Sequence, residues 1–350
     1  MKISVITCHR AYNYGAVLQA YALQKYLTEN GHKAEVIDYY PSYVKSEGSI
    51  VKRIAKKLLF FPNRIRCKKS FGTFLRHRLK LSEKTYSSFE ELKSFPGNSD
   101  MYITGSDQVW NMNMQNGKDD SYFLSFVPEK AKKVSYAASI AMDELNSEQA
   151  DRMKTMLKDF DAVSVREKSG CALLEELHIP CSQVCDPVYL PGADEWKKFA
   201  RKVTDEKYIL VYAFYGQKNV YEYARELGKK ENCKVYSVNT SFVDAFRGID
   251  KYFWAVSPEE FVGLVSGANM VVTNSFHGFS FSLIFNKPVC LFKTDKKGNS
   301  RLLDMAEKIG ANTEKENSQL IADISDYTEI NKKLEEYRKN SMEFLKNCGV

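Results

Sequence analysis

The segment Thr273–Gly278 combines polar side chains, a histidine and a glycine where an apolar run gives way to a helical pattern. A strand-to-helix turn of this kind directs backbone N–H groups and the positive end of a helix dipole toward an anion, so it favours phosphate. Histidine side chains titrate near neutral pH, and His277 is our candidate general acid or base. Asn274, Ser275 and Gly278 are candidate substrate contacts. The alternative is that His277 only caps the helix or bonds a buried carbonyl.

Arg166 ends a second apolar run, Ala162–Val165, where a strand should stop and the next side chain should reach a ligand. A guanidinium offers a planar pair of donors to a carboxylate or a phosphate. We therefore predict that Arg166 holds an anion. The alternative is a surface ion pair with Glu167 or Asp161.

The loop Thr104–Trp110 also follows a short apolar run and contains residue types that could bind a substrate. Gly105 lets the backbone approach a ligand closely, and Ser106 beside it is a further candidate contact. Asp107 is a candidate base toward a hydroxyl. The alternative is that Ser106 or Asp107 caps a turn or a helix, which is the commoner use of such residues.

Asn13 and Gly15 hold the equivalent position after the first predicted strand, and we predict that both contact the substrate. Their loop is not a G-x-G-x-x-G fingerprint, so a dinucleotide site is unsupported. The sequence also lacks a G-x-x-x-x-G-K-[ST] phosphate loop, an H-E-x-x-H helix and a G-x-S-x-G elbow. Its five histidines are not clustered, and we expect no metal site.

Alternating strands and helices must position these loops. A strand at 2–7, a helix at 16–27 and a strand at 33–39 predict a β-α-β unit at the start of the chain. Short apolar strands separated by helices predict parallel sheets, which bind ligands at the carboxyl ends of their strands. The remaining predictions are strands at 100–104, 133–139, 161–166, 183–185, 207–214, 234–238, 270–273 and 288–292, and helices at 146–159, 167–177, 218–230, 258–266, 277–285, 300–309 and 326–345.

The fold class predicted from this alternation is α/β with two Rossmann-like domains and a cleft between them. The N-terminal domain is expected at 1–187, with a basic helical insertion at 45–80. The C-terminal domain is expected at 192–325. Residues 326–350 form a final helix that we expect to pack back on the N-terminal domain. A chain of 350 residues is long enough for two cores.

One segment accounts for the net charge of +7, because residues 45–80 contain twelve Lys or Arg and one acidic residue, Glu47. Within it, residues 50–61 interleave apolar and basic side chains, which predicts an amphipathic helix in peripheral contact with an anionic membrane surface. Nucleic acid and plain solvent are the alternatives for its basic face. Because few aromatic residues in the segment are placed to stack on bases, we expect no nucleic-acid partner.

The sequence has no apolar run near the roughly 18 residues that a membrane-spanning helix needs. The first residues are interrupted too early by His9 and Arg10 to form a signal peptide. We therefore expect a cytoplasmic protein, peripheral at the inner membrane face. The eight cysteines form no C-x-x-C pair and are predicted to be buried free thiols.

Five motifs in this order resemble the polysaccharide pyruvyl transferase family, and the resemblance spans about residues 1 to 310. The serine-x-histidine-glycine element with its following Lys287-Pro288 is the most specific part. The motifs are Asn13-x-Gly15, Thr104–Asp107, Val165–Gly170, Cys185–Pro187 and Asn274–Gly278.

The resemblance implies two Rossmann-like domains arranged as in GT-B glycosyltransferases, no metal or other cofactor, and phosphoenolpyruvate as the donor substrate. It implies His277 as the functional histidine and Arg166 as the functional arginine. Some members have a basic residue just before the histidine, where this sequence has Ser275-Phe276. The donor's anionic groups then need other partners, and the candidates are Lys293, Lys297 and Arg301.

Family membership also implies an acceptor, namely a sugar of a surface polysaccharide or of its lipid-linked precursor. The reaction needs an acid, holders for phosphate and carboxylate, and a base for the sugar hydroxyls; these roles fall to His277, Arg166 and Asp107. The alternative function is a GT-B nucleotide-sugar glycosyltransferase. Many such enzymes hold the donor ribose with paired glutamates, but residues 255–310 contain only Glu259, Glu260 and Glu307.

Overall fold

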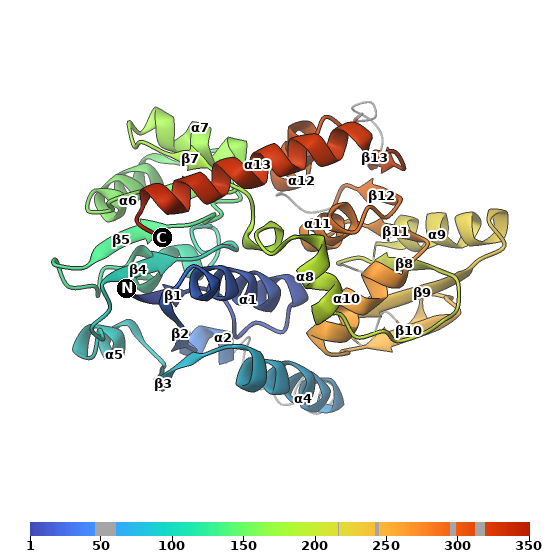
Figure 1. Ribbon diagram of the computed structural model, residues 1–350, viewed down its shortest axis with the longest axis horizontal. Coiled ribbons are helices and arrows are strands. Elements are labelled where there is room, and N and C mark those ends of the chain that lie inside the picture. The colour runs from blue at the N-terminus through green and yellow to red at the C-terminus, as the bar shows by residue number, and fades with distance from the viewer. Residues whose placement is uncertain (46–60, 216, 242–244, 295–298, 312–318) are drawn as a thin grey trace. The chain divides into compact units, whose positions relative to one another are not determined.

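The computed structural model describes residues 1–45, 61–215, 217–241, 245–294, 299–311 and 319–350, and the chain divides into two compact units (Figure 1). Unit 1 contains Met1–Leu58, Leu75–Leu190 and Glu336–Val350. Unit 2 contains Leu59–Phe74 and Pro191–Glu335. The amphipathic helix predicted at 50–61 lies almost wholly outside the described residues, and Lys297 lies outside them too.

The sheet of unit 1 has the strand order β3-β2-β1-β4-β5, and every neighbouring pair is parallel. The chain reverses its direction of travel across the sheet between β1 and β4, which makes this pair the topological switch point. Ile6 pairs with Thr104, and Thr104 pairs with Ser135, so the carboxyl ends of three strands lie level. The strands are β1 (Lys2–Ile6), β2 (Lys33–Tyr39), β3 (Leu81–Tyr86), β4 (Met101–Thr104) and β5 (Lys132–Ser135).

A short two-stranded parallel sheet and several helices complete unit 1. The end of the last helix belongs to this unit, because Tyr337 Oη donates to the Val184 carbonyl at 2.6 Å and Cys185 N–H donates to Ser341 Oγ at 2.8 Å. The elements are α1 (Tyr14–Glu29), α2 (Ser42–Lys45), α5 (Phe89–Ser94), η1 (Asn116–Lys118), η2 (Asp120–Phe123), α6 (Ser147–Leu157), β6 (Ser164–Val165), α7 (Lys168–Glu176), β7 (Ser182–Gln183) and η3 (Pro187–Tyr189), with α4 (Phe61–Arg78) and α13 (Thr328–Asn347) shared between the units.

Unit 2 repeats the arrangement with the order β10-β9-β8-β11-β12-β13, and its switch point lies between β8 and β11. All pairs are parallel except β12 with β13. Thr273 at the end of β11 pairs with Tyr212 and Leu291, so these carboxyl ends also lie level. The elements are α8 (Gly192–Phe199), β8 (Tyr208–Tyr212), α9 (Lys218–Lys230), β9 (Lys234–Asn239), β10 (Lys251–Trp254), α10 (Pro258–Gly267), β11 (Met270–Thr273), α11 (Phe276–Ile284), β12 (Val289–Phe292), α12 (Ser300–Lys308) and β13 (Leu320–Ile324).

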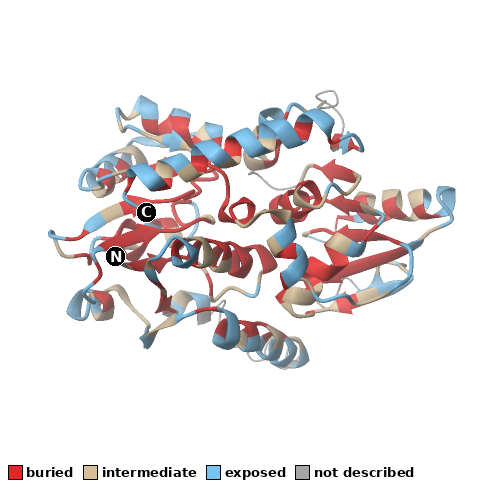
Figure 2. Ribbon diagram, viewed as in Figure 1, coloured by how far each residue is buried: buried red, intermediate tan, exposed pale blue. Residues whose placement is uncertain are grey.

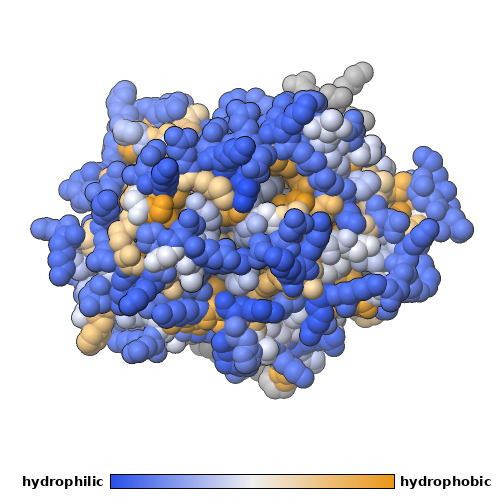
Figure 3. All heavy atoms as spheres, viewed as in Figure 1, coloured by the Kyte–Doolittle hydropathy of each residue, from blue (hydrophilic) through white to orange (hydrophobic). Residues whose placement is uncertain are grey.

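The central strands are buried on both faces, as expected when helices cover both sides of a parallel sheet. Every residue of β4 and β8 is buried, and Figure 2 shows buried strands inside helices whose outer faces are exposed. Helix α11 is buried from Phe276 to Leu283, so it is a core helix of unit 2. Figure 3 shows hydrophilic side chains over most of the face in view. No helix in the described ranges is long and apolar enough to cross a membrane.

The predicted fold class of two Rossmann-like parallel sheets is confirmed, but several strand boundaries are wrong, and the largest differences concern two strands. The predicted strand at 133–139 ends at Ser135, and the one at 161–166 shrinks to Ser164–Val165. The reason is a pair of serines: Ser135 Oγ donates to the Ser164 carbonyl at 3.0 Å and accepts from Ser164 N–H at 2.8 Å. These side-chain bonds lie between the isolated backbone bridges Val134–Ala162 and Ala138–Val165 and interrupt a continuous ladder. Ala137 then takes a positive φ of 56°, and the chain turns.

Candidate functional site

Several of the sequence-predicted site residues lie at the switch points of the two sheets. In unit 1, Asn13 follows β1, and Ser106 and Asp107 follow β4. In unit 2, Asn274 and His277 follow β11. Open parallel sheets bind ligands outside the strand carboxyl ends at this point of the topology. Each unit therefore places some of the candidate residues at the position where open parallel sheets bind ligands.

Arg166 lies directly after β6, and its side chain is only 1% exposed. Its Nη1 donates to Asp186 Oδ2 at 2.8 Å and lies 3.4 Å from Ser106 Oγ. Ser106 Oγ donates to the same carboxylate oxygen at 2.8 Å. Glu167 Oε2 lies 3.7 Å from Arg166 Nε, and Asp107 Oδ1 lies 3.9 Å from Nη2. The ion pair weighed as an alternative is present, but it is buried and its nearest partner is Asp186.

Three carboxylates surround this single guanidinium. Burial opposes the charge of Arg166, but Asp186, Glu167 and Asp107 outweigh it and raise the pKa of Arg166 above its ordinary value. The arginine is therefore a fixed cation. Because the Asp107 side chain is 20% exposed, whereas those of Asp186 and Glu167 are 0% and 2% exposed, Asp107 is the part of the cluster that a ligand could meet.

The backbone holds Asp107 in an unusual conformation, with a positive φ of 82°. Its carbonyl accepts from Val109 N–H at 2.7 Å and from Ser139 N–H at 2.9 Å, which fixes the turn. Its Oδ1 accepts from Gln108 N–H at 2.9 Å. Non-glycine residues at positive φ store roughly 1–3 kcal/mol and concentrate at functional sites. The fold therefore fixes the position of the Asp107 carboxylate, and one of its oxygens already accepts a hydrogen bond within the turn.

Two glycines and an asparagine predicted as ligand contacts have local structural uses. A Cβ on Gly105 would lie 3.3 Å from side-chain atoms of Val5 and Thr7, so Gly105 allows close packing against β1. Gly15 is buried in the first turn of α1. Asn13 is the N-cap of α1 and accepts from Ala16 N–H at 3.2 Å, but its side chain remains partly exposed.

In unit 2 the Asn274 side chain ties the turn after β11 to the loop after β8. Its Oδ1 accepts from Phe214 N–H at 2.7 Å, and its Nδ2 donates to the Phe214 carbonyl at 3.2 Å and to Gln217 Oε1. Gln217 Nε2 extends the network to the Lys293 carbonyl at 2.9 Å. The residue is 2% exposed, and these bonds make it a positioning residue of the turn, while its contact with a substrate stays a prediction.

Ser275 is the N-cap of α11, where its Oγ accepts from Gly278 N–H at 3.3 Å. A Cβ on Gly278 would lie 2.5 Å from Thr273 Oγ1 and 3.0 Å from Tyr212 Cδ1, so only glycine lets α11 pack this closely on the sheet. His277 lies in the first turn, 7% exposed, with its ring 5.3 Å edge-on from that of Phe276. The fold therefore places an imidazole at a helix N-terminus beside a switch point.

Lys293 and Arg301, predicted to hold the donor's anionic groups, are both partly exposed residues of unit 2. Lys293 directly follows β12, and its backbone is fixed by Gln217 and by a bond from its N–H to the Gln319 carbonyl at 2.7 Å. Arg301 lies in the first turn of α12. The backbone of Lys293 is therefore joined to the Asn274 network through Gln217.

Sequence reasoning missed Asp186 and Gln217 as members of the site. It also missed a second buried cluster after β1, in which Asp38 Oδ1 lies 3.2 Å from His9 Nε2 and accepts from Arg10 Nε at 2.6 Å. Thr85 Oγ1 donates to the other oxygen of Asp38 at 2.5 Å. Burial favours the protonated acid, but the bonds from His9, Arg10 and Thr85 outweigh it and lower the pKa of Asp38. No local motif marks such pairs.

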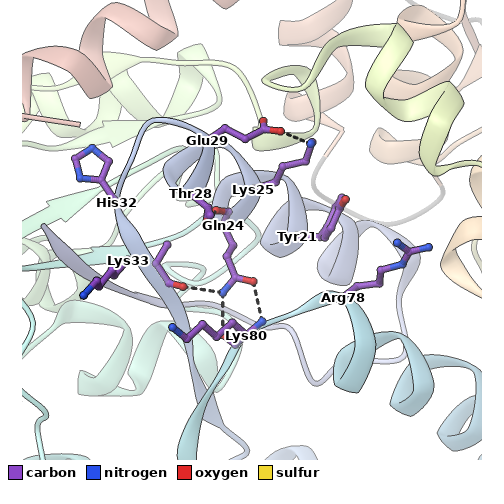
Figure 4. A pocket seen from close by; sticks show the side chains of 10 residues that line it. Tyr21, Gln24, Lys25, Thr28, Glu29, His32, Lys33, Arg78 and Lys80 are labelled. Carbon is purple, nitrogen blue, oxygen red and sulfur yellow. Dashed lines mark hydrogen bonds and ion pairs between the residues drawn. The ribbon is translucent and has the colours of Figure 1, made fainter.

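A groove with a volume of about 490 Å³ lies elsewhere in unit 1 (Figure 4). It lies at the amino ends of β2 and β3, where Lys33 and Lys80 line it, and therefore away from the predicted site residues. Lys25 pairs with Glu29 at the end of α1, and Arg78 lies in the last turn of α4. Basic residues stabilise helix carboxyl ends, so Arg78 has a local structural use there.

Among the residues that the structure describes, no group of three or more His, Cys, Asp or Glu side chains could hold a metal ion.

Comparison with solved structures places the fold among two-domain Rossmann-like enzymes of the GT-B type. The S. aureus MnaA–UDP structure matches with a TM-score of 0.52 and 14% identity, covering 97% of this chain and 90% of that chain. UDP-GlcNAc 2-epimerase from Neisseria meningitidis bound to UDP-GlcNAc matches with a TM-score of 0.50 and 14% identity, covering 97% and 94%. Apo UGT2 of Phytolacca americana matches with 0.52 and 10% identity, covering 99% and 98%.

Identities this low show the fold alone. No curated protein sequence matches the chain significantly. The family follows from a different comparison, in which the sequence model of the polysaccharide pyruvyl transferases matches residues 13–296. The match includes all the predicted site residues except Lys297 and Arg301, and the chain belongs to the polysaccharide pyruvyl transferase family.

Proposed function

We propose that this protein transfers a pyruvyl group from phosphoenolpyruvate to two hydroxyls of one sugar, forming a ketal and releasing phosphate. The acceptor is a sugar of a surface polysaccharide or of its lipid-linked precursor. Family membership supports the reaction class. The observation that carries the assignment to residues is His277 at the N-terminus of α11, beside the switch point of unit 2.

The reaction begins with a proton transfer to the methylene carbon of phosphoenolpyruvate. This creates an oxocarbenium-like centre that a sugar hydroxyl attacks, and the hydroxyl proton leaves to a base. A second hydroxyl of the same sugar then displaces phosphate and closes the ketal ring. His277 is the general acid in this proposal, a role worth roughly 10²- to 10⁴-fold in rate.

Arg166 and the N-terminus of α11 are the proposed holders of the donor's anionic groups. Lys293 and Arg301 are further holders. Arg166 is already paired with Asp186, so its approach to a ligand is from the side of Asp107, 3.9 Å from Nη2. Asp107 is the proposed base for the sugar hydroxyls because it is the most exposed carboxylate of that cluster.

We also propose that the protein works in the cytoplasm without a cofactor and reaches a lipid-linked acceptor at the inner membrane face. The basic sequence between residues 50 and 61 supports the membrane contact, because a cationic amphipathic segment binds anionic lipid.

The test combines binding with turnover. Phosphate release from phosphoenolpyruvate is measured with p-nitrophenyl glycosides that carry free vicinal or 4,6-hydroxyls, for the wild type, His277→Ala and the control His77→Ala. His77 is an exposed histidine of α4. We expect acceptor-dependent release that falls at least roughly 10²-fold in His277→Ala and is unchanged in the control. Full activity of a folded His277→Ala protein would remove the imidazole from the mechanism.

Thermal-shift titration needs no acceptor and separates the two functional classes. Phosphoenolpyruvate should raise the melting temperature of the wild type and of His277→Ala, because a ligand that binds the folded state stabilises it by mass action. Stabilisation by UDP without any by phosphoenolpyruvate would instead favour a nucleotide-sugar glycosyltransferase.

A further inference from the structure

Two of the eight cysteines face one another in unit 1. The Sγ atoms of Cys171 and Cys181 lie 2.8 Å apart, and both thiols are free. Cys171 belongs to α7, and Cys181 immediately precedes β7. Other cysteines contact different groups: Cys8 Sγ accepts from Asn116 Nδ2, and Cys185 Sγ lies by Tyr136 Oη. The fold thus brings together two thiols whose residues are ten positions apart in the sequence.

We propose that Cys171 and Cys181 are a site of intramolecular disulfide formation when the protein meets a low-molecular-weight disulfide. This site is separate from the pyruvyl transfer reaction and does not depend on it. The sequence suggested only buried free thiols, because no C-x-x-C spacing marks the pair. Their juxtaposition is a property of the fold.

The exchange with oxidised glutathione proceeds in two balanced steps. The Cys181 thiolate attacks one glutathione sulfur, which forms a mixed disulfide and releases one glutathione thiolate. The Cys171 thiolate then attacks the Cys181 sulfur, which forms the protein disulfide and releases the second glutathione. Two protein thiols lose two electrons in total, one glutathione disulfide gains them, and the two thiol protons end on the released glutathiones.

Burial sets the order of these steps. Cys171 is 8% exposed, so a bulky disulfide cannot easily reach its sulfur. Cys181 is partly exposed and packs at the edge of the hydrophobic core rather than inside it. The outer thiol therefore meets the oxidant, and the inner thiol, already in contact with it, resolves the mixed disulfide.

The disulfide would cross-link the corner that carries Arg166. Strands β6 and β7 pair through Ser164 with Ser182 and Val165 with Gln183, close to Arg166. Cys171 N–H donates to the Glu167 carbonyl at 3.2 Å, one helical turn after the Arg166 cluster. Closing the loop restricts the unfolded chain, and it should raise the melting temperature of the oxidised protein.

The experiment equilibrates the folded protein in anaerobic glutathione buffers of increasing oxidised fraction, followed by an acid quench, alkylation and peptide mapping. Four proteins are compared: the wild type, Cys181→Ser, Cys171→Ala and the control Cys233→Ser, which removes a partly buried cysteine of unit 2. The wild type unfolded in urea is the reference for unassisted pairing.

We expect the wild type and Cys233→Ser to lose two alkylatable cysteines each and to yield a Cys171–Cys181 linked peptide. This should occur under more reducing conditions than in the urea-unfolded chain. Cys181→Ser and Cys171→Ala should yield no such peptide. The oxidised wild type should melt several degrees above the reduced form, and the melting temperature of Cys181→Ser should not respond to the buffer.

Two results would overturn the proposal. One is a folded wild type that keeps both thiols reduced where the unfolded chain is oxidised. The other is glutathione that stays attached to Cys181 without a linked peptide. A linked peptide with a lower melting temperature would refute the inference that the native geometry accepts the bond. All of these readouts are independent of substrate, so failure of the pyruvyl transfer assay would leave them unaffected.

Discussion

Replacing Asp186 by asparagine tests whether the buried ion pair with Arg166 stabilises unit 1. The substitution preserves shape and retains an oxygen for the bond from Val188 N–H, which Asp186 Oδ1 accepts at 3.1 Å. The substitution removes the negative charge that faces Arg166 Nη1 at 2.8 Å. The new amide N–H group can also face the N–H group of the guanidinium, and two donors cannot bond one another. Because Asp186 and Arg166 are 0% and 1% exposed in their side chains, solvent cannot replace the lost partner.

The expected magnitude follows from burial and from the remaining neighbours. Removing one member of a buried pair typically costs about 3–5 kcal/mol. Glu167 and Asp107 stay within 3.7 and 3.9 Å of the guanidinium and keep it partly compensated. We therefore expect a loss of about 3 kcal/mol in the free energy of unfolding, at the low end of that range. Asp107→Asn, which changes a longer and partly exposed pair, should cost no more than about 1 kcal/mol.

The assay is urea unfolding at pH 7 followed by circular dichroism, with hydrogen exchange of peptides around Ser106 and Arg166 to locate the effect. The double variant Arg166→Met, Asp186→Asn should be more stable than Asp186→Asn alone, because it no longer buries an arginine that has lost its nearest carboxylate. A loss below about 1 kcal/mol for Asp186→Asn, or an equal loss for Asp107→Asn, would refute the reasoning.

Three further substitutions test the loops and the second buried cluster. Asn274→Asp cannot donate to the Phe214 carbonyl, so hydrogen exchange at Phe214 should accelerate by about 10-fold or more. Asn269→Asp keeps its accepting bond from Tyr208 N–H and should change nothing. Gly278→Ala should lower the free energy of unfolding by about 1–3 kcal/mol, and an unchanged urea midpoint would contradict the close packing. Asp38→Asn should destabilise the protein at pH 7. Since the folded pKa of Asp38 is lowered, its contribution is present above the unfolded pKa of about 3.9 and is lost as the pH falls further, so the wild type and variant should converge in acid; parallel pH curves would contradict this.

The elements that sequence patterns predicted well are those with buried strands and regular helices. Strands β2 and β11 and helix α9 begin and end where the apolar periodicity placed them. The missed elements carry different patterns. Strand β3 is an edge strand with mostly exposed polar residues, and β13 runs antiparallel to its neighbour. Neither contains the all-apolar run from which a central parallel strand is recognised.

The same distinction applies to the site. Position in the chain identified the loops after β1, β4 and β11, since polar residues at the ends of buried strands are visible in the sequence. The partners within those loops were not visible. Arg166 pairs with Asp186, twenty residues away, and Asn274 binds the backbone of Phe214, sixty residues away. Such pairs depend on which strands become neighbours, and single residue types do not specify that.

These long-range bonds change how the candidate site should be interpreted. Asn274, Ser275 and Ser106 are polar residues at switch points, but each is buried and bonded to the protein, so they set the shape of the turns. A ligand can more readily meet residues that keep exposed area there, such as Asp107 and Lys293. In each unit the fold thus uses several polar side chains to fix one loop. The strained backbone at Asp107 and the helix start at His277 are the features that this support maintains.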